Sequence, residues 1–237
     1  MIDSRYTFER LEIGASNEEA ISKCKEICKS PRTFSSLWLF GPSGCGKTHL
    51  LKAIHNKLNR RLSRIRGLYI SARELAELLC DFLNGESKLW VSVKSYDYLI
   101  IDNVEDLLGK PETQEVIAEL IAELSFYNKP VFLTSLCHPD ELQNMKTALK
   151  AYNICLPFFE IKSADYNMKK AVVDDFILRK NLNISKEESE LLITSTKHIS
   201  QLKMALISLK YFCENKTVDL EWLKQHGCIA IDEKRRL

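Results

Sequence analysis

Residues 41–48 read G-P-S-G-C-G-K-T and match the pattern G-x-x-x-x-G-K-[ST] in full. The apolar run Ser35–Phe40 precedes this stretch and predicts a buried strand, and Thr48–Leu58 follows it and predicts a helix. A glycine-rich turn between a strand and a helix lets backbone N–H groups and the helix N-terminus converge on phosphate oxygens. The stretch, called the phosphate loop below, therefore predicts a binding site for the phosphates of a nucleotide.

Each residue type in the phosphate loop suits a separate part of that task. Glycines let the backbone approach the phosphates closely. Lys47 supplies a positive charge for the β- and γ-phosphates, and the Thr48 hydroxyl is a ligand for Mg²⁺. Cys45 is either a tolerated small residue or a redox-active thiol. The loop residues predicted to contact the nucleotide are Gly41, Pro42, Ser43, Gly44, Cys45, Gly46, Lys47 and Thr48.

A second apolar run, Tyr98–Ile101, predicts a strand and is followed directly by Asp102. An acid at the end of a buried strand is typical of the residue that holds Mg²⁺ opposite a phosphate loop, directly or through water. We therefore expect Thr48 and Asp102 to be the Mg²⁺ ligands. The next residue, Asn103, places an amide where ATP hydrolysis would require a second carboxylate.

Strands and helices are predicted to alternate through the first two thirds of the chain. Further strands are expected at Gly67–Ile70, Pro130–Thr134 and Phe158–Ile161, and further helices at Asn17–Lys29, Ala72–Leu83 and Thr113–Phe126. This alternation predicts an α/β fold, a P-loop NTPase core with a parallel sheet covered by helices on both faces. Only helices are predicted after it, at Met168–Arg179, Ser185–Thr196, Ile199–Cys213 and Val218–His226. We expect two domains, residues 1–162 and residues 163–237.

The composition is that of an ordinary globular protein, with 45% hydrophobic and 28% charged residues. A net charge of +2 argues against a strongly electrostatic DNA-binding protein. No apolar run is long enough to span a membrane and the N-terminus lacks a signal-peptide pattern, so we expect a cytoplasmic protein with no membrane partner. The eight cysteines are then expected to be reduced, with Cys24 and Cys28 buried rather than ligating zinc.

Four segments together resemble the DnaA/Hda family of AAA+ ATPases, which includes the bacterial replication initiator. They are Y-T-F-E-R-L-E-I-G-A-S-N-E-E-A from Tyr6, G-K-T-H-L-L-K-A-I from Gly46, I-I-D-N-V-E-D-L-L-G-K-P-E-T-Q-E from Ile100, and V-F-L-T-S from Val131. The resemblance implies an AAA+ core followed by a small all-helical lid domain. It also implies nucleotide contacts outside the phosphate loop, from Asn17, His49, Asp102, Asn103 and Thr134.

The same resemblance implies ATP or ADP with Mg²⁺ as ligands, and the replication initiator DnaA or a related AAA+ subunit as partner. It reaches the end of the lid, so we expect the initiator's C-terminal DNA-binding domain to be absent. Weak or no direct DNA binding is expected, because residues 72–95, which correspond to a single-strand contact region in the family, have nearly balanced charge. The peptide that docks relatives on the sliding clamp has no visible counterpart in M-I-D-S-R.

The departures from the family pattern fall on positions that act in hydrolysis. Neutral residues stand where the family carries charge, at Asn103, Leu136, Tyr152 and Ser200. Tyr152 replaces an arginine that reaches the ATP of a neighbouring subunit, and such an arginine stabilises transition-state charge. We therefore expect a regulatory protein that holds nucleotide and hydrolyses it weakly or not at all. Glu105 is a nearby carboxylate that could substitute as the catalytic group.

Alternatives remain open from the sequence. An active ATPase such as a replicative helicase loader would use Glu105 and an arginine from its partner, and a small-molecule P-loop kinase is a more distant alternative. The basic stretch Lys57–Arg66 is either a solvated helix end, whose charge complements the helix dipole, or a contact surface for nucleic acid or an acidic partner.

Overall fold

The structure is a computed structural model of the 237-residue chain. It describes residues 3–29, 35–61, 65–83, 93, 95–142, 156–180, 182 and 184–212. These residues divide into two compact units, which are described separately. Within the described ranges, one unit comprises Met1–Leu11 and Asn17–Ile161, and the other comprises Glu12–Ser16 and Lys162–Leu237.

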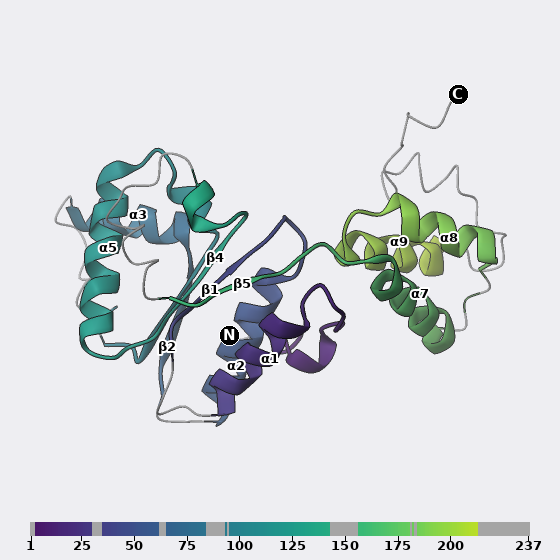
Figure 1. The fold of residues 1–237 in the computed structure, drawn as a ribbon, viewed down its shortest axis with the longest axis horizontal. Coiled ribbons are helices and arrows are strands. Elements are labelled where there is room, and N and C mark those ends of the chain that lie inside the picture. Colours follow the sequence, from purple (N-terminus) through teal and green to yellow (C-terminus); the bar gives the residue numbers. More distant parts are fainter. Residues whose placement is uncertain are drawn as a thin grey trace. The chain divides into compact units, whose positions relative to one another are not determined.

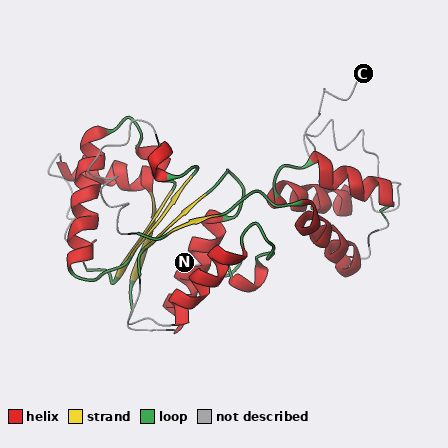
Figure 2. Ribbon diagram, viewed as in Figure 1, coloured by secondary structure: helices red, strands yellow, loops and turns green. Residues whose placement is uncertain are grey.

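The first unit is built on a five-stranded parallel sheet. Its strands are β1 (Leu37–Phe40), β2 (Gly67–Ser71), β3 (Tyr98–Asp102), β4 (Val131–Ser135) and β5 (Phe158–Glu160). They lie in the order β2-β3-β4-β1-β5, and every neighbouring pair is parallel. All residues of β3 and β4 are buried, as expected for central strands covered on both sides. Figure 2 shows the strands in yellow between the red helices.

In the part of the first unit that the structure describes, two helices cover each face of the sheet. One face carries α1 (Glu18–Lys29) and α2 (Lys47–Arg61), and the other carries α3 (Ala72–Leu83) and α5 (Pro111–Phe126) (Figure 1). Successive residues of β3 point to opposite faces, so Ile100 packs in the core with α1 and α2 while Ile101 packs in the core with α3 and α5. The predicted parallel sheet with helices on both faces is therefore confirmed.

The predicted helix and strand boundaries differ from the observed ones by a few residues, for local reasons. α2 begins at Lys47, inside the phosphate loop, and continues past the predicted end at Leu58 to Arg61. Basic side chains in a last helical turn are favourable because they face the negative end of the helix dipole. Three short 3₁₀ turns carry no hydrophobic period and were not predicted: η1 (Phe8–Arg10), η2 (Val104–Leu107) and η3 (Pro139–Glu141).

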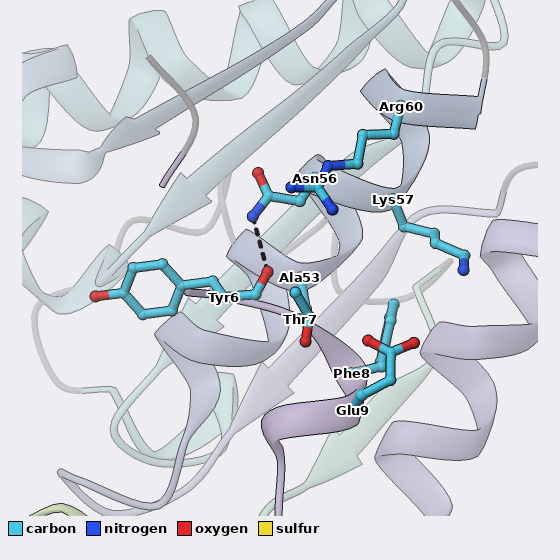
Figure 3. A pocket seen from close by; sticks show the side chains of 8 residues that line it. All are labelled: Tyr6, Thr7, Phe8, Glu9, Ala53, Asn56, Lys57 and Arg60. Carbon is cyan, nitrogen blue, oxygen red and sulfur yellow. Dashed lines mark hydrogen bonds between the residues drawn. The ribbon is translucent and has the colours of Figure 1, made fainter. Parts of the chain in front are cut away.

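The N-terminal segment lies along α2 and is held there through its backbone. The Asn56 side chain donates hydrogen bonds to the carbonyl oxygens of Asp3 and Tyr6, at 2.9 and 2.7 Å, and Figure 3 shows the second of these bonds. His49 Nε2 lies 3.0 Å from the Thr7 carbonyl oxygen. Because α2 begins in the phosphate loop, these contacts fix the N-terminal segment relative to that loop.

Cys24 and Cys28 are free thiols buried in α1. Both belong to the core that α1 forms with α2 and the sheet. Burial raises the pKa of the Cys24 thiol, so the neutral form persists and the residue packs as a small apolar side chain. Among the described residues, no group of three or more His, Cys, Asp or Glu side chains is placed to hold a metal ion.

The second unit contains helices α7 (Tyr166–Lys180), α8 (Lys186–Ser195) and α9 (Ile199–Phe212) in its described part. Their apolar side chains form a core of their own. α8 begins with a capping box, in which Ser185 Oγ accepts from the Glu188 N–H at 3.1 Å and the Glu188 carboxylate accepts from the Ser185 N–H at 2.7 Å. The predicted helix Val218–His226 lies outside the described residues. Within the described part of the chain, no helix is both long and apolar enough to cross a membrane.

Residues Glu12–Ser16 group with these helices, although they precede the whole sheet in sequence. The Ser16 carbonyl oxygen accepts from the Lys162 N–H at 2.9 Å, and Glu12 pairs with Lys203 at 3.1 Å. A segment this short carries no periodic pattern from which its contacts could be inferred. The sequence therefore predicts one division after residue 162, and not this second contribution to the helical unit.

Gly67 pairs with Tyr98 across β2 and β3, and a Cβ at Gly67 would lie 1.8 Å from Tyr98 Cζ. The tyrosine is fully buried, and its hydroxyl is hydrogen bonded to His55 and Asn59, so the ring has no room to move. Gly67→Ala should therefore lower the free energy of unfolding by about 1–3 kcal/mol, the usual cost of overpacking. Urea unfolding followed by circular dichroism measures the change.

Gly14→Ala is the matched control for this prediction. A Cβ at Gly14 would meet the Met168 side chain at 3.6 Å, an ordinary contact distance, in a backbone without positive φ. We expect this variant to unfold within about 0.5 kcal/mol of the wild type. Equal stability of the two variants would contradict the packing described for Tyr98.

Candidate functional site

Three neighbouring strands bring the predicted site residues to one edge of the sheet. Gly41 follows β1, Asp102 ends β3, and Thr134 lies near the end of β4, which stands between the other two. The Gly41 N–H donates to the Ser135 carbonyl oxygen at 3.2 Å, which joins the ends of β1 and β4. The strands are parallel, so their carboxyl ends meet at the edge where open α/β sheets bind ligands.

The phosphate loop has a backbone that favours glycine. Gly41, Gly44 and Gly46 have φ values of 151°, 75° and 108°, in the region that residues with a Cβ rarely adopt. A Cβ on Gly41 would also lie 2.0 Å from the Ile161 carbonyl oxygen. Residues 42–44 are exposed. The turn is therefore closely packed underneath and open on its outer side.

Lys47 is buried at the base of the loop, and the loop itself holds its ammonium group. Nζ donates to the carbonyl oxygens of Gly41 at 2.6 Å and of Pro42 at 2.9 Å, in a residue that is only 5% exposed. A buried charge requires such partners. α2 starts at the same residue, so the positive end of its dipole adds to the ammonium charge. The loop is therefore a preorganised site for an anion.

The Cys45 thiol lies 3.9 Å from Lys47 Nζ. Burial raises the pKa of this thiol, although the lysine charge opposes the shift. A neutral thiol is a weak nucleophile and resists oxidation. The structure therefore favours the small-residue interpretation of Cys45 over a redox role.

Asp102 is buried at the end of β3, where hydroxyl groups hold both of its carboxylate oxygens. Tyr69 Oη donates to Oδ2 and Thr134 Oγ1 donates to Oδ1, each at 2.5 Å. Hydrogen bonds from a hydroxyl to an ionised carboxylate are short and strong. The two neighbouring strands, β2 and β4, therefore hold the carboxylate in one orientation.

Asn103 has a left-handed backbone, with φ 62° and ψ 61°. Asparagine adopts this conformation more readily than most residues. Its N–H donates to Thr134 Oγ1 at 2.9 Å, and its carbonyl oxygen accepts from the Asp106 N–H at 3.0 Å. Asn103 turns the chain out of β3 and into η2. The asparagine therefore suits this turn, besides placing an amide where a carboxylate would be needed for hydrolysis.

Glu105 lies half-buried in η2, and its carboxylate accepts from its own backbone N–H and from that of Leu136 just after β4. The Oε2 atom is buried and has no hydrogen-bond partner among the described residues. Burial raises the pKa of Glu105, and the charge of Lys47 opposes that shift. Glu105 is therefore an acid that interacts electrostatically with the lysine of the phosphate loop.

Two other predicted nucleotide contacts, His49 and Asn17, make hydrogen bonds or ring contacts near the N-terminus of the chain. The His49 ring meets the Tyr6 ring edge-on, with centroids 5.2 Å apart, and contacts the Thr7 carbonyl oxygen. Asn17 is buried at the start of α1, where its carbonyl oxygen accepts from the Ile21 N–H at 3.0 Å. Direct contacts of Asn17 and His49 with a nucleotide stay predictions.

The remaining positions at which the sequence departs from the family pattern are neutral. Ser135 is buried, and its hydroxyl accepts from Trp38 Nε1 at 2.8 Å and donates to a backbone carbonyl group at 2.6 Å. Leu136 is 45% exposed, and Ser200 is exposed in the first turn of α9. Tyr152 lies outside the described residues. The polar residues of β4 thus support Asp102 and the sheet through internal hydrogen bonds.

Tyr69 is a site residue that sequence reasoning missed. The alternation of β2 puts its side chain on the sheet face that carries α2, with Leu68 on the opposite face. Lys52 Nζ lies 5.2 Å from the centre of the Tyr69 ring and 4.7 Å from that of Tyr6. The alternation of side chains along β2 could have indicated which sheet face Tyr69 lies on. The pairing of β2 with β3, which brings Tyr69 to Asp102, has no signal in the local sequence.

A pocket of about 400 Å³ lies between the N-terminal segment and α2 (Figure 3). Residues 6–9 line it together with Ala53, Asn56, Lys57 and Arg60. None of these residues is a predicted nucleotide contact. The two cations come from the basic stretch Lys57–Arg66, and Glu9 stands with them, so the stretch borders a pocket of mixed charge.

Residues 2–154 match the family described as Bacterial DnaA ATPase domain. The chromosomal replication initiator protein DnaA of Roseobacter denitrificans is 28% identical over 185 residues, which are 77% of this chain and 41% of that protein. The chain therefore spans less than half the length of this relative.

Solved structures agree with this match. A structure of the replication initiator DnaA bound to AMPPCP and single-stranded DNA superposes with a TM-score of 0.82 and 25% identity, over 96% of this chain and 69% of that one. A DnaC helicase loader superposes with a TM-score of 0.60 and 17% identity, over 67% of this chain and 98% of that one. The second likeness is one of fold alone.

Tyr69→Phe should weaken the predicted Mg²⁺ site without unfolding it. The substitution removes the hydroxyl donor to Asp102 Oδ2, and loss of such a supporting group typically costs about 10–100-fold in metal affinity. The Mg²⁺ concentration for half-maximal binding of a fluorescent ATP analogue should therefore rise by about tenfold. A Mg²⁺ titration at fixed analogue concentration measures this shift.

Tyr98→Phe is the control, since it removes a buried tyrosine hydroxyl that bonds to His55 and Asn59 instead of Asp102. It should lower stability and leave the Mg²⁺ titration unchanged. Identical titrations for Tyr69→Phe and the wild type would rule out a supporting role for Tyr69.

Proposed function

The chain belongs to the bacterial DnaA ATPase domain family, and from this premise we propose that it is a nucleotide-binding regulator of chromosomal replication initiation. It binds ATP or ADP with Mg²⁺ in the phosphate loop, and it pairs with the replication initiator DnaA or a related AAA+ subunit. Its own hydrolysis of ATP is weak or absent. The observation that carries the proposal is a preorganised phosphate loop, with Lys47 buried at its base.

The residues present fit a magnesium nucleotide. The positive φ values of Gly41, Gly44 and Gly46 keep side chains away from the inside of the loop, and the first turn of α2 directs backbone N–H groups at an anion. Thr48 and Asp102 offer a hydroxyl and a carboxylate, the oxygen ligands that Mg²⁺ takes together with phosphate oxygens and water. When bound, Mg²⁺ neutralises phosphate charge. The AMPPCP named for the initiator structure supports the same class of ligand.

Weak hydrolysis is supported by the chemistry of the residues around this loop. The Asn103 amide cannot accept a proton from water, and its left-handed backbone serves the turn into η2. Neither hydroxyl of β4 is free, because Thr134 bonds to Asp102 and Ser135 bonds within the sheet. Leu136 and Ser200 are also neutral at positions where the family carries charge. Binding groups are therefore retained while several groups that stabilise transition-state charge are missing.

A nucleotide shared between two subunits links their association to the nucleotide state. In such assemblies an arginine from one subunit stabilises charge on the phosphates held by the other. With Tyr152 at the position of that arginine, this chain accepts a partner's arginine without supplying one. A subunit of this kind ends an assembly of initiator subunits instead of extending it.

The competing functions have less support. A helicase loader is the alternative from the enzyme class, and its likeness to this chain extends only to the fold. Direct DNA contact is not proposed, because the basic stretch borders a mixed-charge pocket, and the Arg66 guanidinium donates to the Ser95 carbonyl oxygen at 3.1 Å. No motif supports binding to the sliding clamp.

Mixing the chain with the DnaA initiator of the same organism tests the proposed partnership. A complex should form at micromolar concentrations in the presence of ATP, and its affinity should change when ATP is replaced by ADP or omitted. Light scattering coupled to size-exclusion chromatography measures the complex, and phosphate release measures hydrolysis by the mixture.

Lys47→Ala is the matched variant, because it removes the charge at the base of the phosphate loop. It should lose at least about tenfold in nucleotide affinity, and the response of the complex to nucleotide should disappear. No complex under any nucleotide condition would eliminate the initiator as partner. Strong stimulation of the initiator's hydrolysis would contradict the role of Tyr152.

A further inference from the structure

We propose that Glu105 is the catalytic carboxylate of this site, the group that orients and deprotonates a water molecule for slow hydrolysis of bound ATP. This inference rests on the proposed nucleotide binding, and it assigns slow ATP hydrolysis to the same site. It assigns the hydrolytic role to the third residue after Asp102 instead of the first, where Asn103 stands.

The path of the backbone after β3 explains why Glu105, and not residue 103, supplies the carboxylate. Asn103 leaves β3 in a left-handed conformation, and its N–H is bonded to Thr134 of β4. The chain then turns through η2, which brings Glu105 over the end of β4, where its carboxylate accepts from the Leu136 N–H. If β3 had continued past Asp102, Glu105 would lie in line with β3. The turn instead places Glu105 where its carboxylate interacts electrostatically with Lys47.

The hydrogen bonding of Glu105 is incomplete in a way that points to a ligand. Its Oε2 atom is buried and has no partner among the described residues, although a buried acceptor without a partner costs about 1–3 kcal/mol. The Asp102 carboxylate, by contrast, is satisfied by two hydroxyl donors. A buried carboxylate oxygen with an unused lone pair, on a residue that interacts electrostatically with Lys47, is suited to accept a hydrogen bond from water.

Electrostatics supports the same assignment. Burial raises the pKa of Glu105 above that of a solvated glutamate, and the Lys47 charge limits the shift. A general base works best when its pKa approaches the working pH, because it is then a stronger proton acceptor while still largely ionised. The next residue, Asp106, pairs with Arg73 at 3.7 Å instead.

The reaction is the hydrolysis of the terminal phosphoanhydride. The oxygen of water forms a bond to the γ-phosphorus, and the bond from that phosphorus to the β–γ bridging oxygen breaks. The bridging oxygen keeps the electron pair and leaves as part of ADP. One proton of the water passes to the Glu105 carboxylate and then to solvent, so the products are ADP, inorganic phosphate and a proton. In the isolated protein no partner supplies an arginine to this ATP, which accounts for a slow rate.

Single-turnover hydrolysis tests the assignment. The protein, in excess over ATP and Mg²⁺-saturated, is quenched over time, and the conversion of bound ATP to ADP is measured by chromatography. The wild type should convert its ATP slowly but completely, and Glu105→Gln should be slower by about 100-fold or more. The glutamine oxygen can still accept from the Leu136 N–H, so the variant retains the structural bond.

Asp106→Asn is the matched control, because it removes a carboxylate from the same turn at a side chain that is paired with Arg73. Its rate constant should stay within about threefold of the wild type. ATP affinity, measured separately with a fluorescent analogue, should be similar in all three proteins.

The pH dependence of the wild type gives a second readout that requires no variant. The raised pKa belongs to an acid that must be ionised to act, so the rate constant should fall as the pH is lowered through that pKa, while ATP stays bound. The rate of Glu105→Gln should lack this dependence.

Three outcomes would overturn the assignment. Equal rates for Glu105→Gln and the wild type would give Glu105 a structural role only. Bound ATP that is never converted by the wild type would exclude hydrolysis. Both results leave nucleotide binding and the initiator complex intact, and so leave the proposed function standing. Failure of the wild type to bind ATP would instead remove both proposals.

Discussion

The site depends on the confinement of the backbone at Gly41, where β1 ends between two other strands. Its N–H is bonded to the carbonyl oxygen of Ser135 in β4, and a Cβ would stand 2.0 Å from the carbonyl oxygen of Ile161, just after β5. The direction in which the phosphate loop leaves the sheet is therefore set by packing between strands. Lys47 and the start of α2 follow within the same short turn. The packing of the strands therefore also fixes the positions of Lys47 and the start of α2.

The two sides of the site are built by different physical means. The phosphate side uses backbone geometry, which glycine makes accessible and a lysine charge completes. The Asp102 side uses side-chain hydroxyl groups from neighbouring strands, in an interior where unpaired polar groups are costly. Under the proposed function, such a site keeps its nucleotide while the amide at Asn103 lowers the rate of hydrolysis.

Local patterns predicted much of this arrangement. The phosphate loop, its flanking strand and helix, and Asp102 each carry a signal within a few residues, and the alternation of strands and helices correctly predicts the covered parallel sheet. Asn103 marks the limit of such reasoning. Its residue type shows the loss of a carboxylate, but the left-handed turn that redirects Glu105 depends on a bond to Thr134 in another strand. Tyr69 and the segment Glu12–Ser16 were missed for the same reason, because their contacts join residues far apart in sequence.

The position of Lys52 gives the start of the chain an influence on Asp102. Its ammonium group lies over the rings of both Tyr6 and Tyr69, and the second of these tyrosines donates to the Asp102 carboxylate. An affinity tag fused close to Tyr6, or a translation start chosen a few codons downstream, alters the surroundings of that ammonium group. We therefore expect recombinant versions that differ at their first residues to differ in magnesium dependence before phosphate affinity.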